Sequence, residues 1–127
     1  MKNKKLYLLV IGLMLASLIL SACGSTSPSD VGFPTGKFVD SENDLVGYYF
    51  NEDMTWAYFM YGQNGAEGKY SLKDNLWIEE GTDGECPFPG TYEWTFDGTN
   101  LKFKLVGEDK CDPRRESTDG RTFVMTK

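Results

Sequence analysis

Hydrophobic and polar residues alternate regularly in the last third of the chain. Tyr92, Trp94 and Phe96 are separated by single polar residues, and residues 101–105 alternate leucine or phenylalanine with lysine. Alternation with a period of two is typical of a strand that buries one face. The polar residues 97–100 between these segments include a glycine, which favours a tight turn. The pattern therefore predicts a β-hairpin in this part of the chain.

The chain from residue 36 onward predicts further short strands. Apolar alternation or a short apolar run marks residues 45–50, 54–61, 68–72, 76–80 and 121–125, and polar or glycine-containing turns separate them. No segment shows helical periodicity over a length that predicts a helix. Because short strands joined by tight turns favour antiparallel neighbours, the expected fold is all-β. It is a small up-and-down meander of about eight short strands, closed into a barrel or nearly so.

The first twenty-two residues follow a different pattern. Lys2, Lys4 and Lys5 precede a mostly apolar segment that runs from Leu6 to Leu20. This segment is shorter than the roughly 20 residues that a transmembrane helix needs, and it matches the apolar region of a secretory signal peptide. Residues 1–22 are therefore predicted to be a signal peptide.

The end of the apolar segment resembles the bacterial lipobox, in which an aliphatic residue and two small residues precede a cysteine. Here the four residues are Leu20-Ser21-Ala22-Cys23. The resemblance implies a lipoprotein that is cleaved before Cys23, acylated there with palmitate or a similar chain, and anchored in the cell membrane or outer membrane outside the cytoplasm. Residues 23–35 are then the lipidated cysteine and a flexible tether, because small polar residues and prolines bury little surface. Residues 36–127 form the barrel domain.

The number of cysteines agrees with this anchor. The chain has three cysteines, and an odd number leaves one of them over in an exported protein. If Cys23 carries lipid, Cys86 and Cys111 remain as a pair in a compartment that permits disulfides. The alternative is two unpaired thiols.

The charge of the chain limits its partners. Removal of residues 1–22 takes away three lysines and no acidic residue, which leaves ten basic and 19 acidic residues and a net charge of −9. Nucleic-acid binding depends on clustered Lys and Arg, so no nucleic-acid partner is expected. The expected partner is the membrane, through the lipid on Cys23; the sequence carries no signal of oligomeric state.

The sequence offers little catalytic chemistry. It contains no histidine, which excludes Ser-His and Cys-His catalysis and any zinc site that uses imidazole. Two clusters of charged residues remain. The acidic residues between Glu79 and Glu85 are expected to be exposed, and of Arg114 and Arg115 one is expected to pair with nearby carboxylates. The sequence therefore predicts no catalytic residue, no metal site, no cofactor and no enzymatic activity.

Residues 36–127 as a whole resemble the lipocalin-like (calycin) domains of small bacterial secreted proteins and lipoproteins. The resemblance rests on Cys86-Pro87, Gly90-Thr91-Tyr92-Glu93-Trp94, Asp97-Gly98, Leu101, Asp109-Lys110-Cys111 and Arg114 or Arg115. The domain opens with Gly36-Lys37-Phe38, where lipocalins usually have Gly-x-Trp. In that family an arginine near the last strand packs over the tryptophan, a part for which both Arg115 and Arg121 qualify here.

Alternate strand residues form an expected interior rich in aromatic side chains. The expected inward set is Val46, Tyr48, Phe50, Trp56, Tyr58, Met60, Tyr70, Leu72, Ile78, Tyr92, Trp94, Phe96, Leu101, Phe103, Leu105, Phe123 and Met125. By resemblance and aromatic content, we expect a small apolar ligand inside the barrel, bound by Trp56, Tyr58, Tyr92, Trp94 and Phe103.

The alternative is a barrel whose interior is filled by these aromatic residues, as in other small barrels. The domain would then be a structural or protein-interaction module of the cell envelope. Its contact surface would be an apolar outer strip formed by Leu45, Tyr49, Phe59 and Tyr61.

Overall fold

The computed structural model describes residues 32–127, except residue 83. The predicted signal peptide, Cys23 and most of the predicted tether lie outside the described residues. The strands are β1 (Gly36–Asp40), β2 (Val46–Phe50), β3 (Thr55–Met60), β4 (Gln63–Lys73), β5 (Leu76–Glu79), β6 (Gly90–Phe96), β7 (Asn100–Leu105) and β8 (Thr122–Met125). One short helix, α2 (Asp112–Thr118), lies between β7 and β8 in the sequence.

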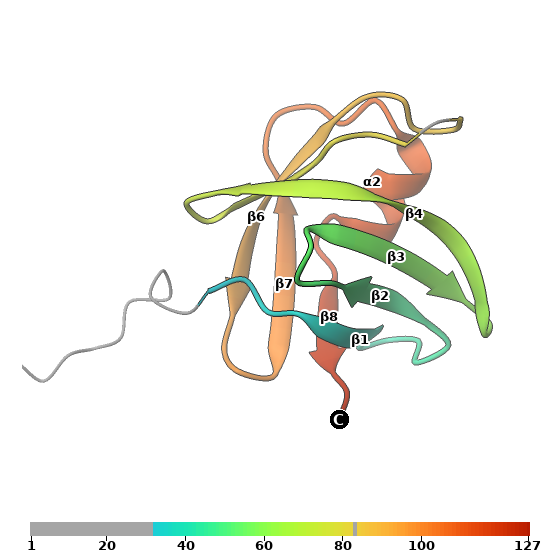
Figure 1. Cartoon of the computed structure of the whole chain (residues 1–127), viewed down its shortest axis with the longest axis vertical. Coiled ribbons are helices and arrows are strands. Elements are labelled where there is room, and N and C mark those ends of the chain that lie inside the picture. Colours follow the sequence, from blue (N-terminus) through green and yellow to red (C-terminus); the bar gives the residue numbers. More distant parts are fainter. Residues whose placement is uncertain (1–31, 83) are drawn as a thin grey trace, which may run out of the picture.

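The eight strands form one antiparallel sheet in sequence order. The sheet closes into a barrel because β8 pairs with β1, where Phe38 lies opposite Met125 and Asp40 opposite Phe123 (Figure 1). The hairpin predicted from residues 91–105 is formed by β6 and β7, with Trp94 opposite Phe103. The predicted fold class, an up-and-down meander closed into a barrel, is confirmed.

The centre of the barrel is filled by aromatic side chains. Trp77, Tyr92 and Phe123 are fully buried. The ring of Trp77 lies 5.2 Å from that of Phe103 and 6.0 Å from that of Phe50. Aromatic pairs at such distances contribute about 0.5–1.5 kcal/mol each beyond the area that they bury. This aromatic core accounts for much of the stability of a small domain.

Strand β5 presents the opposite residues to the interior from those predicted. The expected inward residue Ile78 is only partly buried and lies outside the core, whereas Trp77 and Glu79 on either side of it have no exposed surface. A shift of one residue exchanges the two faces of a strand. Two contacts decide the inward face of β5. The large ring of Trp77 fills the barrel centre, and Glu79 forms an ion pair with Arg114 of α2.

The packed domain begins before the predicted boundary at residue 36. The ring of Phe33 lies 5.1 Å from Phe50, 5.3 Å from Tyr70 and 5.2 Å from Trp94, and Pro34 is buried beside it. Phe33 therefore covers the end of the barrel at which β1 begins. Phe33 and Pro34 of the predicted tether are thus packed at this end of the barrel, whereas Gly32 and Thr35 are exposed.

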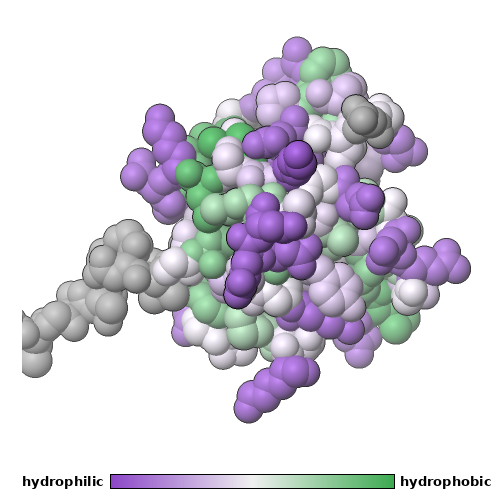
Figure 2. Space-filling model, in the orientation of Figure 1, coloured by the Kyte–Doolittle hydropathy of each residue, from purple (hydrophilic) through white to green (hydrophobic). Residues whose placement is uncertain are grey.

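The predicted outer apolar strip is smaller than the sequence suggests. Phe59 is only 8% exposed, because Tyr49 packs on it and the Lys37 ammonium lies 5.1 Å from its ring. Gly47 makes room for this ring: a Cβ there would come within 2.8 Å of it. Leu45 and other large apolar residues do remain exposed. On the face shown in Figure 2, hydrophobic residues form separate small groups among polar ones. In the described part of the chain, no helix has the length and apolar character needed to cross a membrane.

Candidate functional site

Helix α2 lies over the end of the barrel opposite Phe33, and a disulfide fixes its start. The bond joins Cys86, in the loop after β5, to Cys111, immediately before the helix, with Cα atoms 5.2 Å apart. This distance lies within the range usually found between the Cα atoms of two disulfide-bonded cysteines. The pairing predicted from the cysteine count is therefore formed in the structure.

The helix itself was not predicted from the sequence. It has seven residues, with Pro113 in its first turn and Gly120 just beyond its end at a φ of 70°. A proline at the start and a glycine after the end are the usual signals of helix boundaries. Two turns are too short to show hydrophobic periodicity, and so short a helix depends on tertiary contacts.

The main contact is made by Arg114, which points from α2 into the barrel end. Its guanidinium donates from Nε to Asp109 Oδ2 at 2.7 Å, and from Nη2 to Asp109 Oδ1 at 2.6 Å and to the carbonyl oxygen of Phe88 at 2.8 Å. Its Nη1 is paired with Glu79 Oε2. Burial lowers the pKa of Arg114, but two buried carboxylates hold the charged form in place. The guanidinium therefore joins β5, the loop before β6 and the segment before α2.

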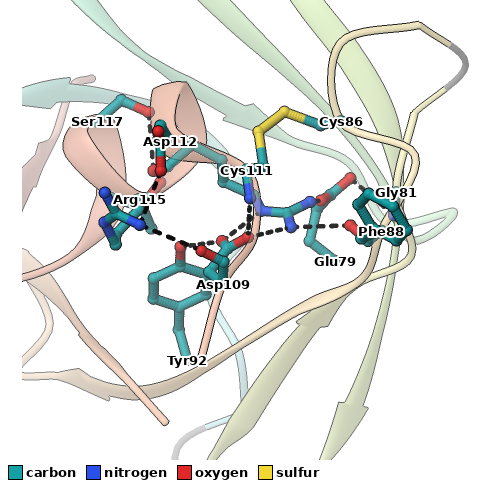
Figure 3. Close-up of polar contacts among 12 residues, drawn as sticks. Glu79, Gly81, Cys86, Phe88, Tyr92, Asp109, Cys111, Asp112, Arg115 and Ser117 are labelled. Carbon is teal, nitrogen blue, oxygen red and sulfur yellow. Dashed lines mark hydrogen bonds and ion pairs between the residues drawn. A yellow bond between two sulfur atoms is a disulfide. The ribbon is translucent and has the colours of Figure 1, made fainter. Parts of the chain in front are cut away.

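Asp109 is the centre of this buried cluster (Figure 3). Besides Arg114, it accepts hydrogen bonds from the Tyr92 hydroxyl at 2.5 Å and from the backbone N–H of Cys111 at 2.9 Å. Burial and the adjacent Asp109 carboxylate raise the pKa of Tyr92, so this hydroxyl stays protonated and donates. Gly90 allows the close approach, because a Cβ there would lie 2.6 Å from Asp109 Oδ2. The cluster is buried and internally bonded, so its role is structural.

The sequence predicted that one of the two arginines pairs with nearby carboxylates, but Arg115 is paired as well, at a more solvated position. Arg115 pairs with Asp112 one turn away at 2.8 Å, and both side chains are largely solvated, at 41% and 70% exposure. Among the described residues no arginine lies over the ring of Phe38: Arg115 pairs with Asp112 on α2, and Arg121 pairs with Glu42. The aromatic rings found against Phe38 are instead Phe50 and Phe96.

Between α2 and the barrel lies a pocket of about 530 Å³. One side is the inner face of β2, β3 and β4, the other is α2, and the loop after β5 borders the opening. The apolar side is formed by Val46, Tyr48, Trp56, Tyr58, Met60, Gly65 and Ala66. The polar side and rim comprise Asp40, Asn43, Glu79, Thr82, Glu85, Cys86, Pro113, Arg114, Glu116, Ser117 and Arg121.

Three aromatic rings lie on the apolar side of the pocket. The Tyr48 ring lies 5.0 Å from Tyr58 and 5.8 Å from Trp56, each in an edge-on arrangement. The Tyr48 hydroxyl is hydrogen-bonded to Thr118 Oγ1 of α2 at 2.8 Å, and its burial raises the pKa of Tyr48 to about 12. Tyr58 is only partly buried, and burial together with the nearby Asp40 carboxylate raises its pKa. The pocket therefore has a rigid aromatic side that is fixed to the helix.

The charges around the pocket are predominantly negative. Arg121, which like Arg114 borders it, donates to Glu42 at 2.9 Å and lies 3.6 Å from Asp40. Two further carboxylates at the rim, Glu85 and Glu116, are exposed and form no ion pair with any described residue. The rim therefore carries unneutralised negative charge.

The structure separates the five aromatic residues that were predicted to bind a ligand. Trp56 and Tyr58 line the pocket, whereas Tyr92, Trp94 and Phe103 belong to the packed core and do not line it. They point inward as predicted, but at a level of the barrel where neighbouring rings leave no room. Among the described residues, no group of acidic or cysteine side chains is arranged to hold a metal ion.

Comparison with known protein families, with characterised proteins and with solved structures gives no match to this chain.

Proposed function

We propose that this protein is a membrane-anchored, non-enzymatic bacterial lipoprotein whose lipocalin-like barrel binds a small apolar ligand between α2 and strands β2–β4. The observation that carries the proposal is the pocket of about 530 Å³ with its aromatic side. Small-molecule sites typically measure about 300–1,000 Å³ and are lined mainly by apolar and aromatic residues with a few polar groups. The pocket matches that description in size, and its barrel side, formed by apolar and aromatic residues, matches it in composition.

The fixed position of α2 supports the same proposal. The disulfide of Cys111, the buried ion pairs of Arg114 and the hydrogen bond from Tyr48 to Thr118 hold the helix at three points. A site that is already formed loses less conformational entropy when a ligand binds. The helix thus serves as a rigid side of the pocket.

The proposed anchor agrees with the direction in which the chain enters the barrel. Cys23 precedes Phe33 by ten residues, and Phe33 covers the end of the barrel that is opposite the pocket. A lipid on Cys23 would therefore be connected to the covered end of the barrel, while the pocket lies at the opposite end. Incorporation of labelled palmitate that is lost in Cys23→Ala would support this anchor, and equal labelling of both proteins would contradict it.

Contact quenching tests ligand binding. The full chain, inserted in phosphatidylcholine nanodiscs, is titrated with 10-bromo-1-decanol, whose bromine quenches a tryptophan that it touches. We expect saturable quenching through Trp56. The variant Ala66→Phe fills the pocket from β4, and Glu67→Phe adds the same ring to the next residue, on the outer face of the strand.

The two variants give the experiment its control. Quenching that persists in Glu67→Phe and is lost in Ala66→Phe, with unchanged circular dichroism in both, supports the pocket. Because partition into the lipid is the same for all three proteins, it cancels in the comparison. Absence of saturable quenching in the unmodified chain, or equal quenching in both variants, would refute the proposed function.

A further inference from the structure

We infer that the pocket selects an organic cation, a ligand with an apolar body and a positively charged head such as a quaternary or protonated amine. This inference rests on the proposed function and adds the charge of the ligand to it. Three features of the pocket support it. The arginines that line the pocket are already paired with carboxylates, two other carboxylates at the rim are unpaired, and aromatic rings line the apolar side.

No free cation faces the pocket from the described residues that line it. Arg114 is buried and bonded to Glu79, Asp109 and a backbone carbonyl. Arg121 is shared between Asp40 and Glu42. An anionic head group, such as a fatty-acid carboxylate, would have to break one of these pairs to gain a partner. The pocket is therefore poorly suited to an anion.

The unpaired carboxylates lie where a head group would emerge. Glu116 projects from α2, and Glu85 precedes Cys86 in the loop that borders the opening. The disulfide joins that loop to the start of α2, so both carboxylates are attached to one cross-linked unit. Pocket residues supply four carboxylates and two guanidinium groups, and neither Glu85 nor Glu116 has a cationic partner among the described residues. A cation at the opening would gain attraction without displacing an existing pair.

The aromatic side favours the same charge. The face of a tryptophan or tyrosine ring attracts a cation within about 6 Å of its centre, and recognition of quaternary ammonium groups commonly uses several such rings. Tyr48, Trp56 and Tyr58 meet at one side of the pocket, with Tyr58 partly exposed. The charged head would lie against the partly exposed ring of Tyr58 and face the carboxylates, and the apolar body would contact Trp56 and Met60.

Three ligands that share a ten-carbon chain test the selection. Decyltrimethylammonium, decanol and decanoate are each used to displace 10-bromo-1-decanol from the full chain in phosphatidylcholine nanodiscs at low ionic strength, with the free ligand measured by dialysis. We expect the cation to bind at least tenfold more tightly than decanoate, with decanol between them. The tenfold difference corresponds to about 1.4 kcal/mol.

Two double variants assign the effect to the opening. Glu85→Gln with Glu116→Gln is expected to weaken cation binding about tenfold and to leave decanol unchanged. Glu52→Gln with Glu93→Gln removes the same charge from exposed positions that do not line the pocket, and is expected to leave cation binding within twofold. All four positions are exposed, so none of the substitutions removes a core contact.

The outcomes separate this inference from the function on which it rests. Decanoate binding as tightly as the cation, or equal behaviour of the two double variants, would overturn the selection for cations while ligand binding itself stands. If none of the three ligands displaces the probe because the probe does not bind, the proposed function fails and the inference fails with it.

Discussion

Replacement of Arg114 by methionine tests how the pocket is held in place. The substitution keeps an unbranched side chain of similar length but removes the charge and every donor of the guanidinium. Glu79 and Asp109 would then remain buried without their cation. Asp109 keeps its bonds from Tyr92 and from the backbone of Cys111, whereas the one hydrogen bond that Glu79 keeps among the described residues is from the N–H of Gly81.

The expected cost follows from these contacts. Removing one partner of a buried ion pair typically destabilises a protein by about 3–5 kcal/mol, because the remaining charge is left uncompensated. For a domain of this size each kcal/mol lowers the melting temperature by about 4–8 °C. We therefore expect Arg114→Met to lower the melting temperature by about 12–40 °C. The underlying loss of about 3–5 kcal/mol is a large share of the roughly 5–15 kcal/mol of stability that a small domain has.

The neighbouring residue provides the control. Arg115→Met removes the same group from a solvated pair, whose side chains are 41% and 70% exposed, and exposed pairs contribute at most about 1 kcal/mol. Thermal unfolding of the full chain, followed by far-ultraviolet circular dichroism, measures the melting temperature of both variants. Adding Glu79→Gln to Arg114→Met is expected to recover part of the loss, since one of the two orphaned charges is then neutral. Similar small losses for both arginines would refute the view that this cluster holds α2.

Three further predictions concern stability. Replacing Cys86 and Cys111 by alanine opens a loop of about 26 residues, and urea unfolding should show a loss of about 3–4 kcal/mol; an unchanged midpoint would mean that the bond does not constrain the chain. Gly90→Ala places a Cβ 2.6 Å from an oxygen of Asp109, so we expect a loss of about 1–3 kcal/mol, and a neutral result would show that the cluster can shift. Burial raises the pKa of Tyr48 to about 12, so folded protein keeps a proton that the unfolded chain loses near pH 10. The stabilisation, at most about 3 kcal/mol, is complete below pH 10 and is lost between pH 10 and pH 12. Tyr48→Phe should flatten the stability profile in that interval alone, and an unchanged slope would contradict the assigned cause.

The fold was predictable because its signals are local. The hairpin of β6 and β7 follows from strict alternation on both sides of a polar turn at residues 97–100, and the structure pairs Trp94 with Phe103. The partner of Cys86 was predictable only if Cys23 was assigned to the lipid. The hairpin follows from the pattern of neighbouring residues, and the disulfide follows from the number of cysteines. Both can be determined from the sequence alone.

The site was harder to predict because it depends on position along the barrel. Alternation distinguishes inward from outward residues, but it does not show which inward residues meet packed neighbours and which meet a gap. Trp56 and Trp94 are both inward, yet only Trp56 lines the pocket. In β5 the pattern itself is ambiguous, because Trp77 and Ile78 are both apolar. The face is decided by the fit of Trp77 in the barrel centre and by the ion pair of Glu79 with α2, and both are tertiary contacts. The helix that creates the gap has too few residues to be recognised by its periodicity.

The indole N–H resonances of the tryptophans test the central claim, that a ligand enters the pocket beneath α2. The chain has three tryptophans, of which Trp56 lines the pocket while Trp77 and Trp94 lie in the packed core. With the full chain labelled with ¹⁵N, saturating decanol should shift the indole N–H signal of Trp56 and leave the signals of Trp77 and Trp94 in place. A shift of Trp94 or Trp77 with Trp56 unchanged, or no shift of any of the three, would contradict the account.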